Sequence, residues 1–342
     1  MRGGFAGGAG RVGVLLALLT AAGVRAKVDF EFPTPNTTWA RGDLTTFVQP
    51  TVSGDPESGL FGCTRTGGTQ FHEGLDVKPM KRDRAGEAAD PIFAVLDGIV
   101  RHVSLAPGKS SYGRYVVIEH PDQQPAVYTL YAHLARVEPG LRAGLPVKKG
   151  QVIATMGRSA GGYAIPKDRA HLHFEIGLRL TDDFQSWFNW RKFGSPNDHG
   201  AYNGMNLMGL DPLDVLRQAR SGRLASLRHY FDRLRPVVTV RIATTRVPDF
   251  IRRYPALLRK PLDGLVAGWE IECNATGLPF AWTPLSPNEV IGLAPNQVRI
   301  VASDAAALRA FRCKQLVKPR RGGDLPGDDL QTMLQLVFGL RR

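Results

Sequence analysis

The stretch Ala-His-Leu-His-Phe-Glu-Ile-Gly-Leu, residues 170–178, decides how the rest of the chain is interpreted. Its aromatic and β-branched residues alternate with polar ones, which predicts a strand on which side chains i and i+2 share one face. His171 and His173 therefore point the same way, with Glu175 next along that face. Two adjacent imidazoles can divide the work of a hydrolytic zinc site, one as a metal ligand and one as a proton carrier. The alternative is a pair of histidines on a solvated strand face.

A second informative stretch, Phe71–Val77, contains two further competent zinc ligands, His72 and Asp76. In a fully extended strand four residues span about 13 Å, which is too far for two ligands of one metal. Gly74 disfavours a helix here. A bend at Gly74 could instead bring the two side chains together.

Short β-like runs with turn signals between them dominate the middle of the chain. Turn signals include Asp97-Gly98 and Lys149-Gly150. The runs are Ile92–Ser104, Arg114–His120, Val127–Ala132, Gln151–Met156 and His171–Leu178. This pattern predicts a mainly β fold, an antiparallel β-sandwich or open barrel. His133 comes directly after one predicted strand and is expected at its rim.

Six motifs follow one another across residues 60–180: His72–Asp76, Asp97–Val100, Ser111–His120, Tyr128–Leu134, Val147–Ile153 and His171–Glu175. Together and in this order they resemble the lysostaphin/LytM-type zinc metallopeptidases, which cut peptides of bacterial cell walls. The fold that the resemblance implies is of the duplicated hybrid motif type.

The resemblance implies a role for each of five residues. His72, Asp76 and His173 match the ligands of one zinc ion per chain, whereas His133 and His171 match the histidines that contact substrate and the metal-bound water. Zinc chemistry agrees with this division of roles, because three protein ligands leave a coordination position for water. A neighbouring histidine can then shuttle the proton or bind the developing oxyanion.

Other positions near these motifs each allow two roles. Glu175 could support a metal ligand, but an ion pair on the strand face is the simpler expectation. Arg65 resembles an arginine common in the family near this site, or is a surface charge. Two insertions, Gly162–Ala170 and Thr181–Leu210, extend the family pattern. The aromatic residues of the second, such as Trp187, could wall a substrate groove or pack locally.

The N-terminal segment Met1–Ala26 has the pattern of a secretory signal peptide. Arg2 and Arg11 flank an apolar run that is too short to span a bilayer comfortably. We expect this signal to be cleaved, with an uncleaved anchor as the alternative. No later run is long and apolar enough to cross a membrane. The protein is therefore expected to be exported, to the periplasm or the extracellular cell envelope.

The rest of the chain divides into three parts by composition. Residues 27–59 form an extended lead-in, residues 60–213 the metallopeptidase domain, and residues 214–342 a basic α+β accessory module. A helix is predicted from Asp211 to about Leu234, with a weak point at Ser221-Gly222. The other elements expected in the module are strands at Val237–Ala243, Ala267–Cys273 and Gln297–Ala302 and helices at Ala305–Phe311 and Asp328–Leu340.

The chain has three cysteines, too few for a disulfide scaffold, although an exported protein can oxidise one pair. Cys273 and Cys313 both lie in the C-terminal third and are the expected pair, which leaves Cys63 free. The pairing cannot be fixed from sequence alone.

Positive charge is concentrated in the accessory module. Residues 214–342 contain 21 Lys and Arg against 11 Asp and Glu, whereas residues 27–213 contain 20 of each kind. Such an excess can attract an anionic envelope polymer, and export argues against nucleic acid as the partner. The alternative is a set of scattered, solubilising arginines.

The sequence thus predicts an exported zinc metalloendopeptidase that hydrolyses peptide bonds in peptidoglycan. One alternative is a catalytically silent LytM-like protein that regulates cell-wall amidases. Another is an envelope adhesin in which the basic module acts and the peptidase is vestigial. All five site positions are filled, which favours the enzyme. The scissile bond (D,D, D,L or glycine bridge) and the oligomeric state are left open.

Overall fold

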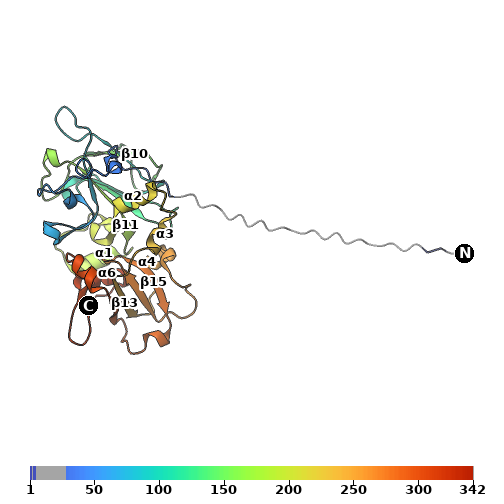
Figure 1. Ribbon diagram of the computed structural model, residues 1–342. Helices are drawn as coiled ribbons and strands as arrows, with labels where there is room; N and C mark the ends of the chain where they lie inside the picture. Colours follow the sequence, from blue (N-terminus) through green and yellow to red (C-terminus); the bar gives the residue numbers. More distant parts are fainter. Residues whose placement is uncertain (2, 5–27, 342) are drawn as a thin grey trace.

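The computed structural model describes residues 1, 3, 4 and 28–341, and Figure 1 shows residues 28–341 as two stacked regions. The predicted signal peptide, Met1–Ala26, lies almost wholly outside these residues. Among the described residues, no helix combines the length and the apolar character that crossing a membrane requires.

A seven-stranded sheet forms the centre of the upper region in Figure 1, and all of its strand pairs are antiparallel. In sheet order its strands are β12 (Leu207–Leu210), β11 (Leu172–Arg179), β7 (Tyr128–Ala132), β6 (Tyr115–Glu119), β5 (Gly98–Ser104) and β9 (Pro146–Val147), with β3 (Leu75–Val77) also paired to β11. The path is open, since it ends in two different strands. The predicted open antiparallel architecture is confirmed.

A smaller antiparallel sheet lies against this one, and a two-stranded ribbon lies beside the metal ligands. The small sheet contains β4 (Pro91–Phe93), β10 (Val152–Thr155) and β8 (Arg136–Val137), and the ribbon contains β1 (Gly62–Arg65) and β2 (Gln70–His72). Ile92 and Ile153 of the small sheet share one core with Val116 and Ile118 of β6. Since side chains alternate along a strand, Tyr115 and its neighbours form a second apolar cluster on the opposite face.

The lead-in is built into the domain that follows it. Val48 forms a β-bridge with Val77 of β3, and the Gln49 amide donates to the Asp76 carbonyl at 2.9 Å. The side chains of Phe47 and Val48 are fully buried. Residues 47–49 therefore extend the sheet at β3, next to the candidate site.

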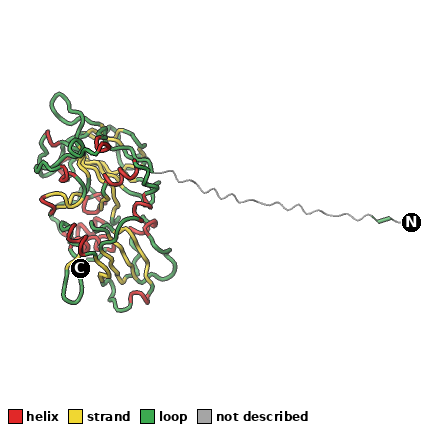
Figure 2. Tube along the Cα trace, viewed as in Figure 1, coloured by secondary structure: helices red, strands yellow, loops and turns green. Residues whose placement is uncertain are grey.

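The lower region of Figure 1 contains a second antiparallel sheet with the last helix, α6 (Asp328–Phe338), beside it. The sheet order is β15 (Pro279–Leu285), β14 (Gly268–Cys273), β13 (Val238–Ala243) and β16 (Val298–Ser303); a short ribbon joins β17 (Val317–Lys318) and β18 (Leu325–Pro326). The remaining helices are α1 (Phe184–Arg191), α2 (Pro212–Arg220), α3 (Leu227–Asp232), α4 (Asp249–Arg253) and α5 (Ala305–Ala310). Figure 2 shows the helices concentrated between the two sheets and around the lower one.

The helix predicted over residues 211–234 is two helices, α2 and α3. Asp211 caps α2 as expected, because its side chain accepts hydrogen bonds from the amides of Leu213 and Asp214. The helical conformation is interrupted at Gly222, which adopts a φ of +68° that favours glycine. Ser226 then caps α3.

The disulfide differs from the predicted one. Cys63 and Cys313 are bonded across a sequence separation of 250 residues, with their Cα atoms 5.6 Å apart. Cys273 is a free thiol and lies fully buried in β14, where it faces the core. Burial raises the pKa of this thiol well above its ordinary value, which keeps it unreactive. The prediction was wrong because nearness in sequence does not report which strands lie next to each other.

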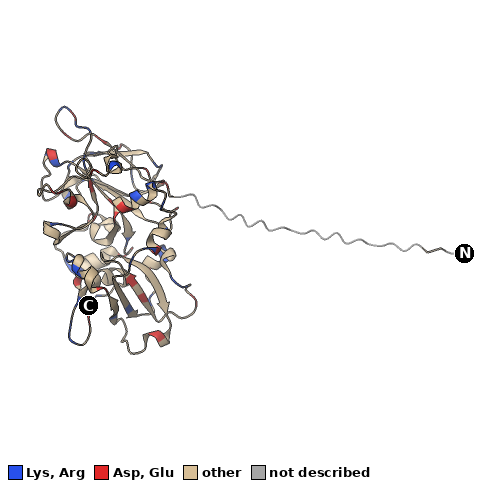
Figure 3. Cartoon of the chain, viewed as in Figure 1, with Lys and Arg blue, Asp and Glu red and all other residues tan. Residues whose placement is uncertain are grey.

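Charged residues of both signs are interspersed over the C-terminal region (Figure 3). Arg228 pairs with Asp232 at 2.9 Å, and Arg241 pairs with Glu270 at 2.7 Å. Part of the basic excess lies instead on exposed residues such as Arg320.

Candidate metal centre

Strand register gathers the candidate residues at one end of β11. In the β3–β11 pair Asp76 lies opposite His173, and in the β11–β7 pair His173 lies opposite Ala132. His133 directly follows Ala132 at the end of β7. His72 ends β2 and is joined to β3 by a two-residue turn. Antiparallel pairing thus brings together residues that are far apart in the chain.

The bend expected at Gly74 is present, and no larger residue would fit there. A Cβ atom at this position would lie 2.5 Å from the Phe174 carbonyl oxygen and 3.0 Å from the His173 ring. The missing side chain lets the turn between β2 and β3 lie directly against β11, so that His72 Nε2 reaches to 3.2 Å from Asp76 Oδ1.

Three donor atoms from these segments form a nearly equilateral triangle. His173 Nδ1 lies 3.0 Å from Asp76 Oδ1 and 3.1 Å from His72 Nε2, and the third side is the 3.2 Å separation above. All three side chains are buried. A tetrahedral ion with ligands at about 2.0–2.2 Å needs donors about 3.3–3.6 Å apart, slightly more than these separations. The residues therefore fit a small tetrahedral metal ion with one position left open.

Hydrogen bonds outside the triangle orient both imidazole ligands. His72 Nδ1 lies 2.8 Å from the Leu60 carbonyl oxygen, so it carries the proton and leaves Nε2 free for a metal. His173 has the opposite arrangement: its Nε2 faces Glu175 Oε1 at 3.0 Å, and its Nδ1 belongs to the triangle. A carboxylate behind a histidine ligand is a common support of metal sites.

Glu175 is not an ion-pair residue on a solvated strand face, as the sequence had suggested. Its side chain is only 1% exposed. The hydroxyl groups of Tyr112 and Tyr128 donate to its two oxygens at 2.5 Å and 2.9 Å. The sequence did not identify either tyrosine, although both lie within the six motifs. Their contact with Glu175 depends on the pairing of three strands.

Arg65 lies at the outer side of the triangle, on Asp76. Its guanidinium group donates to Asp76 Oδ2 at 2.5 Å, which leaves Oδ1 for the metal. A second bond, from Nε to the Ser58 carbonyl oxygen at 3.3 Å, holds the arginine in place. Arg65 is therefore part of the site and not a free surface charge.

His133 and His171 lie next to the triangle, with ring centroids 4.7 Å apart. Each Nδ1 faces a backbone carbonyl oxygen, that of Ser159 at 2.8 Å and that of Arg169 at 2.7 Å. Each Nδ1 can therefore carry the ring proton, which leaves Nε2 as the acceptor. His133 adopts a φ of +60°, an uncommon conformation for a non-glycine residue, at the point where the chain leaves β7.

Burial controls the protonation of these two histidines. It lowers the pKa of His133 well below its usual value, an effect that the neighbouring His171 and His173 reinforce. Burial also lowers the pKa of His171, although the charge of Asp76 opposes this shift. Both rings are therefore neutral proton acceptors near pH 7.

In the donor triangle, by contrast, interactions with neighbouring residues outweigh the effect of burial on the pKa values. Burial alone would raise the pKa of Asp76, but its interactions with His72, His171 and His173 hold it well below its usual value. Burial alone would lower the pKa of His173, yet its bonds to Asp76 and Glu175 outweigh this and raise it to about 9. Without an ion, a proton is held between His173 and Asp76, so metal binding must displace that proton.

A cavity of 140 Å³ opens beside the triangle. Pro50 and Thr51 of the lead-in form one wall, and Tyr163, Ala164 and Ile165 of the first insertion form another. The cavity is also lined by Arg65, Asp76, His133, Arg169 and His171. The first insertion therefore reaches the site.

The aromatic residues of the second insertion pack away from this cavity. Trp187 of α1 is buried, and its indole nitrogen donates to Gln335 of α6. Phe184 packs against Trp187 in a tilted arrangement, with ring centroids 5.6 Å apart. Of the two roles that the sequence left open, local packing is the one the structure shows.

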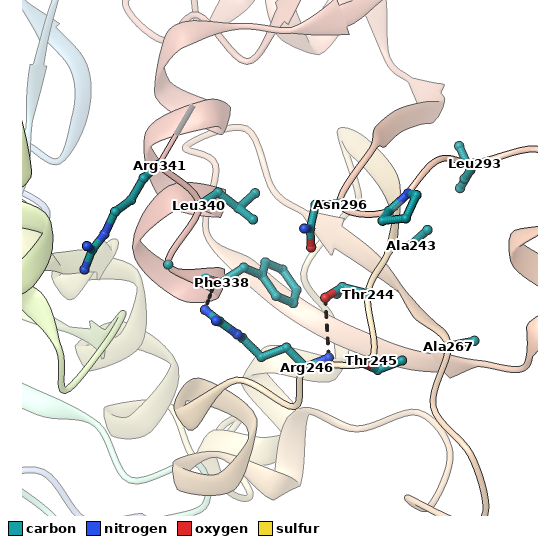
Figure 4. Close-up of a pocket in the computed structure, with 12 residues that line it drawn as sticks. Ala243, Thr244, Thr245, Arg246, Ala267, Leu293, Asn296, Phe338, Leu340 and Arg341 are labelled. Carbon is teal, nitrogen blue, oxygen red and sulfur yellow. Dashed lines mark hydrogen bonds between the residues drawn. The ribbon is translucent and has the colours of Figure 1, made fainter.

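A larger cavity, of 790 Å³, lies in the C-terminal region (Figure 4). Arg246 and Phe338 lie side by side on its wall, and the Arg246 guanidinium donates to the Phe338 carbonyl oxygen. Its lining contains no histidine, cysteine, aspartate or glutamate. It therefore lacks the groups that hydrolysis requires, and the smaller cavity beside His171 is the candidate catalytic site.

Comparison with solved structures finds peptidases among the similar chains. A zinc-containing peptidase from Vibrio cholerae is 32% identical, over 31% of this chain and 26% of that one, with a TM-score of 0.23. The catalytic domain of lysostaphin from Staphylococcus simulans is 19% identical, over 46% and 87%, with a TM-score of 0.29. A variant of the catalytic domain of the prophage-encoded M23 protein EnpA from Enterococcus faecalis is 24% identical, over 38% and 79%, with a TM-score of 0.27.

This chain thus spans about a quarter of the length of the Vibrio cholerae peptidase. Because the TM-scores are low, these structures do not support an assignment. No curated protein sequence matches the chain. Residues 70–183 match the model of Peptidase family M23, and this span contains all five predicted site residues. The comparisons thus show this part of the chain, which carries the candidate site, to be similar to Peptidase family M23.

Proposed function

We propose that the protein is a zinc-dependent metalloendopeptidase that hydrolyses peptide bonds in bacterial peptidoglycan. The observation that carries the proposal is the donor triangle of His72, Asp76 and His173, with two neutral histidines beside it in a cavity. The match of residues 70–183 to the model of Peptidase family M23 supports peptide-bond hydrolysis. The wall-cleaving relatives that the sequence resembles support peptidoglycan peptides as the substrate.

His72, Asp76 and His173 would hold one zinc ion per chain. When bound, zinc supplies Lewis-acid chemistry, which activates a water molecule and polarises the scissile carbonyl group. Nitrogen and carboxylate donors suit zinc, and burial of the triangle keeps competing water away from it. Arg65 and Glu175 hold Asp76 and His173 in the orientation that this requires.

We assign the proton transfers to His133 and His171. Because the Nδ1 proton of each ring is held by a backbone carbonyl, the unprotonated Nε2 can accept a proton from the attacking water. The resulting imidazolium can stabilise the developing oxyanion and then return the proton to the leaving amine. The water oxygen thereby joins the carbonyl carbon, the C–N bond breaks, and the amine leaves with the proton.

The proposal also assigns a place and an arrangement to the whole chain. Peptidoglycan lies outside the cytoplasm, so the function requires export, which the predicted signal peptide Met1–Ala26 would provide. Residues 60–213 would form the catalytic domain, with residues 27–59 contributing a wall of its cavity. Residues 214–342 would form an accessory module.

Zinc content and peptidoglycan cleavage, measured on the same preparations, test the proposal. We expect one zinc per wild-type chain by elemental mass spectrometry and peptide-bond cleavage products from purified sacculi. Asp76→Ala should lose both, whereas the control Asp97→Ala should keep both, because that carboxylate is exposed and pairs with Lys148. Equal cleavage after chelation of zinc would overturn the mechanism. Binding to the wall without zinc or cleavage would support the silent regulator instead.

A further inference from the structure

Arg169 lies at the candidate active site and has no side-chain partner among the described residues. Arg169 lines the 140 Å³ cavity together with Asp76, His133 and His171, and it is half-buried. Among residues 28–341 its side chain makes no hydrogen bond or ion pair. Its backbone, in contrast, is fixed: the amide donates to the Pro166 carbonyl oxygen at 3.1 Å, and the carbonyl accepts from His171 Nδ1 at 2.7 Å.

Other arginines around the same insertion are paired. Arg158 donates to both oxygens of Glu87, at 2.8 Å and 3.0 Å. Arg82 donates to the Lys167 carbonyl oxygen at 2.7 Å. Arg65, on the other side of the cavity, is bonded to Asp76. Arg169, which lines the cavity, thus keeps its donors unused.

The cavity cannot supply an anion for Arg169 itself. Asp76 is the only carboxylate in the lining, and both of its oxygens are engaged, Oδ2 by Arg65 and Oδ1 in the donor triangle. A bound zinc ion would add further positive charge. A half-buried guanidinium in such surroundings favours an anionic ligand, and its planar fork matches a carboxylate.

We propose that Arg169 binds a free carboxylate of the substrate within one or two residues of the scissile bond. The distance follows from the size of the cavity, since 140 Å³ holds roughly five water molecules. The preferred substrate is then a stem peptide that bears a free carboxylate beside the bond, and not an uncharged glycine bridge. This inference rests on the proposed function, because it names the substrate class of the same site.

Matched muropeptide dimers test the inference, one with free carboxylates and one with the same groups converted to carboxamides. Binding is measured calorimetrically with full-length, zinc-loaded His133→Ala, which should hold the dimers without cleaving them. We expect the carboxylate form to bind about tenfold to a hundredfold more tightly, the scale of a hydrogen bond to a charged group. Adding Arg169→Gln should abolish this preference, and Arg169→Lys should restore part of it.

Arg84→Gln is the matched control, since Arg84 is an exposed arginine of the same domain outside the cavity. Thermal unfolding of each variant checks its folding, and the comparison of the two dimers on the parent protein needs no arginine variant. Equal binding of both dimers, no binding of either, or an equal loss for both in Arg169→Gln would overturn the inference. Failure of zinc-loaded wild type to cleave any dimer, including a pentaglycine-bridged one, would instead overturn the proposed function.

Discussion

Glu175 Oε1 lies 3.0 Å from His173 Nε2, on the opposite side of the imidazole from Asp76. Both nitrogens of one buried ring therefore face a carboxylate oxygen. In a metal-loaded site this arrangement fixes the tautomer of His173, because Nε2 must carry the ring proton and donate a hydrogen bond to Glu175. It also makes Nδ1 a better electron donor to the ion.

Replacement of Glu175 by Gln should weaken metal binding without emptying the site. Loss of a carboxylate behind a histidine ligand typically costs ten- to a hundredfold in metal affinity. Gln keeps one acceptor oxygen for one tyrosine hydroxyl, and its amide NH2 can donate to the oxygen of the other, so the fold should remain. Competition titration with a zinc chelator measures the change. Glu119→Gln is the control, since Glu119 pairs with Arg101 away from the site. An unchanged zinc affinity in Glu175→Gln would show that the contact between Glu175 and His173 contributes to packing but not to metal binding.

Removal of His133 or His171 should separate binding from chemistry. Neither is in the donor triangle, so both alanine variants should retain zinc. Each should lose roughly a hundredfold or more in kcat, the scale of a positioned acid–base group. Steady-state kinetics and zinc content are measured on the same samples, with the exposed His229→Ala as control. Full activity of either variant on a verified substrate would remove that residue from the mechanism.

Local sequence predicted most of the upper sheet, because alternating β-branched residues and turn signals act over a few residues. The runs at Arg114–His120 and Val127–Ala132 correspond to β6 and β7. The run at Ile92–Ser104 is two strands, β4 and β5, since Asp97-Gly98 turns the chain within it. Strand β15 was missed: Pro279 and Pro284 are unusual in strands and hid its pattern.

The sequence indicated which five residues would lie together at the candidate site, but not the residues that hold them in place. The five candidate positions were predicted from the resemblance of six motifs to one family, and three of them are side chains that zinc prefers as ligands. The roles of Tyr112 and Tyr128, and the disulfide of Cys63 with Cys313, depend on strand pairing across large sequence separations. A polar residue buried by tertiary packing looks the same in sequence as one that faces solvent.

The Cys63–Cys313 disulfide should stabilise the folded chain substantially. It closes a loop across 250 residues, and such a cross-link typically contributes about 2–4 kcal/mol to the free energy of unfolding. We expect the double variant Cys63→Ser/Cys313→Ser to lose about that amount in urea denaturation. A phosphine reductant should destabilise wild type but not the double variant. Cys273→Ala should remain sensitive to the reductant, since Cys273 is a free thiol. If the reductant left the stability of wild type unchanged, the disulfide would be excluded.

The buried His120 should make stability depend on pH. Burial lowers its pKa to about 4, although Nδ1 lies 2.9 Å from the Asp97 carbonyl oxygen. The unfolded pKa is about 6.5. Between these values the unfolded chain binds the extra proton, so this contribution is fully present above about pH 6.5 and is lost as pH falls to about 4.

The size of this loss is about 3 kcal/mol. His120→Gln removes the titration, so its stability should fall less than that of wild type over the same pH range. Urea denaturation from pH 7 to pH 4 measures the difference, with the exposed His229→Gln as control. Parallel curves for wild type and His120→Gln would contradict the assignment.

The basic excess in residues 214–342 should concentrate the protein on anionic envelope surfaces. Truncation is a poor test, since the disulfide at Cys313 and the contact between Trp187 and Gln335 tie this region to the rest of the chain. Substitution of exposed basic residues by Gln keeps these contacts. A suitable set is Lys260, Arg320, Arg321 and Arg341. A matched control removes the same number of charges from exposed residues of the charge-balanced part: Arg41, Lys81, Arg84 and Arg142.

Binding to purified sacculi and to anionic vesicles is then measured by pull-down over a salt series. Each basic residue near an anionic surface contributes up to about 1 kcal/mol, so the first set should weaken binding severalfold at low salt. The difference should shrink as salt rises, because the Debye length is about 10 Å at 0.1 M and shortens further. The control set should weaken binding less, since its charges lie outside the basic region. Cleavage of a small soluble peptide should be unchanged in both sets. Equal binding by all three proteins at every salt concentration would mean that the charges only solubilise the surface.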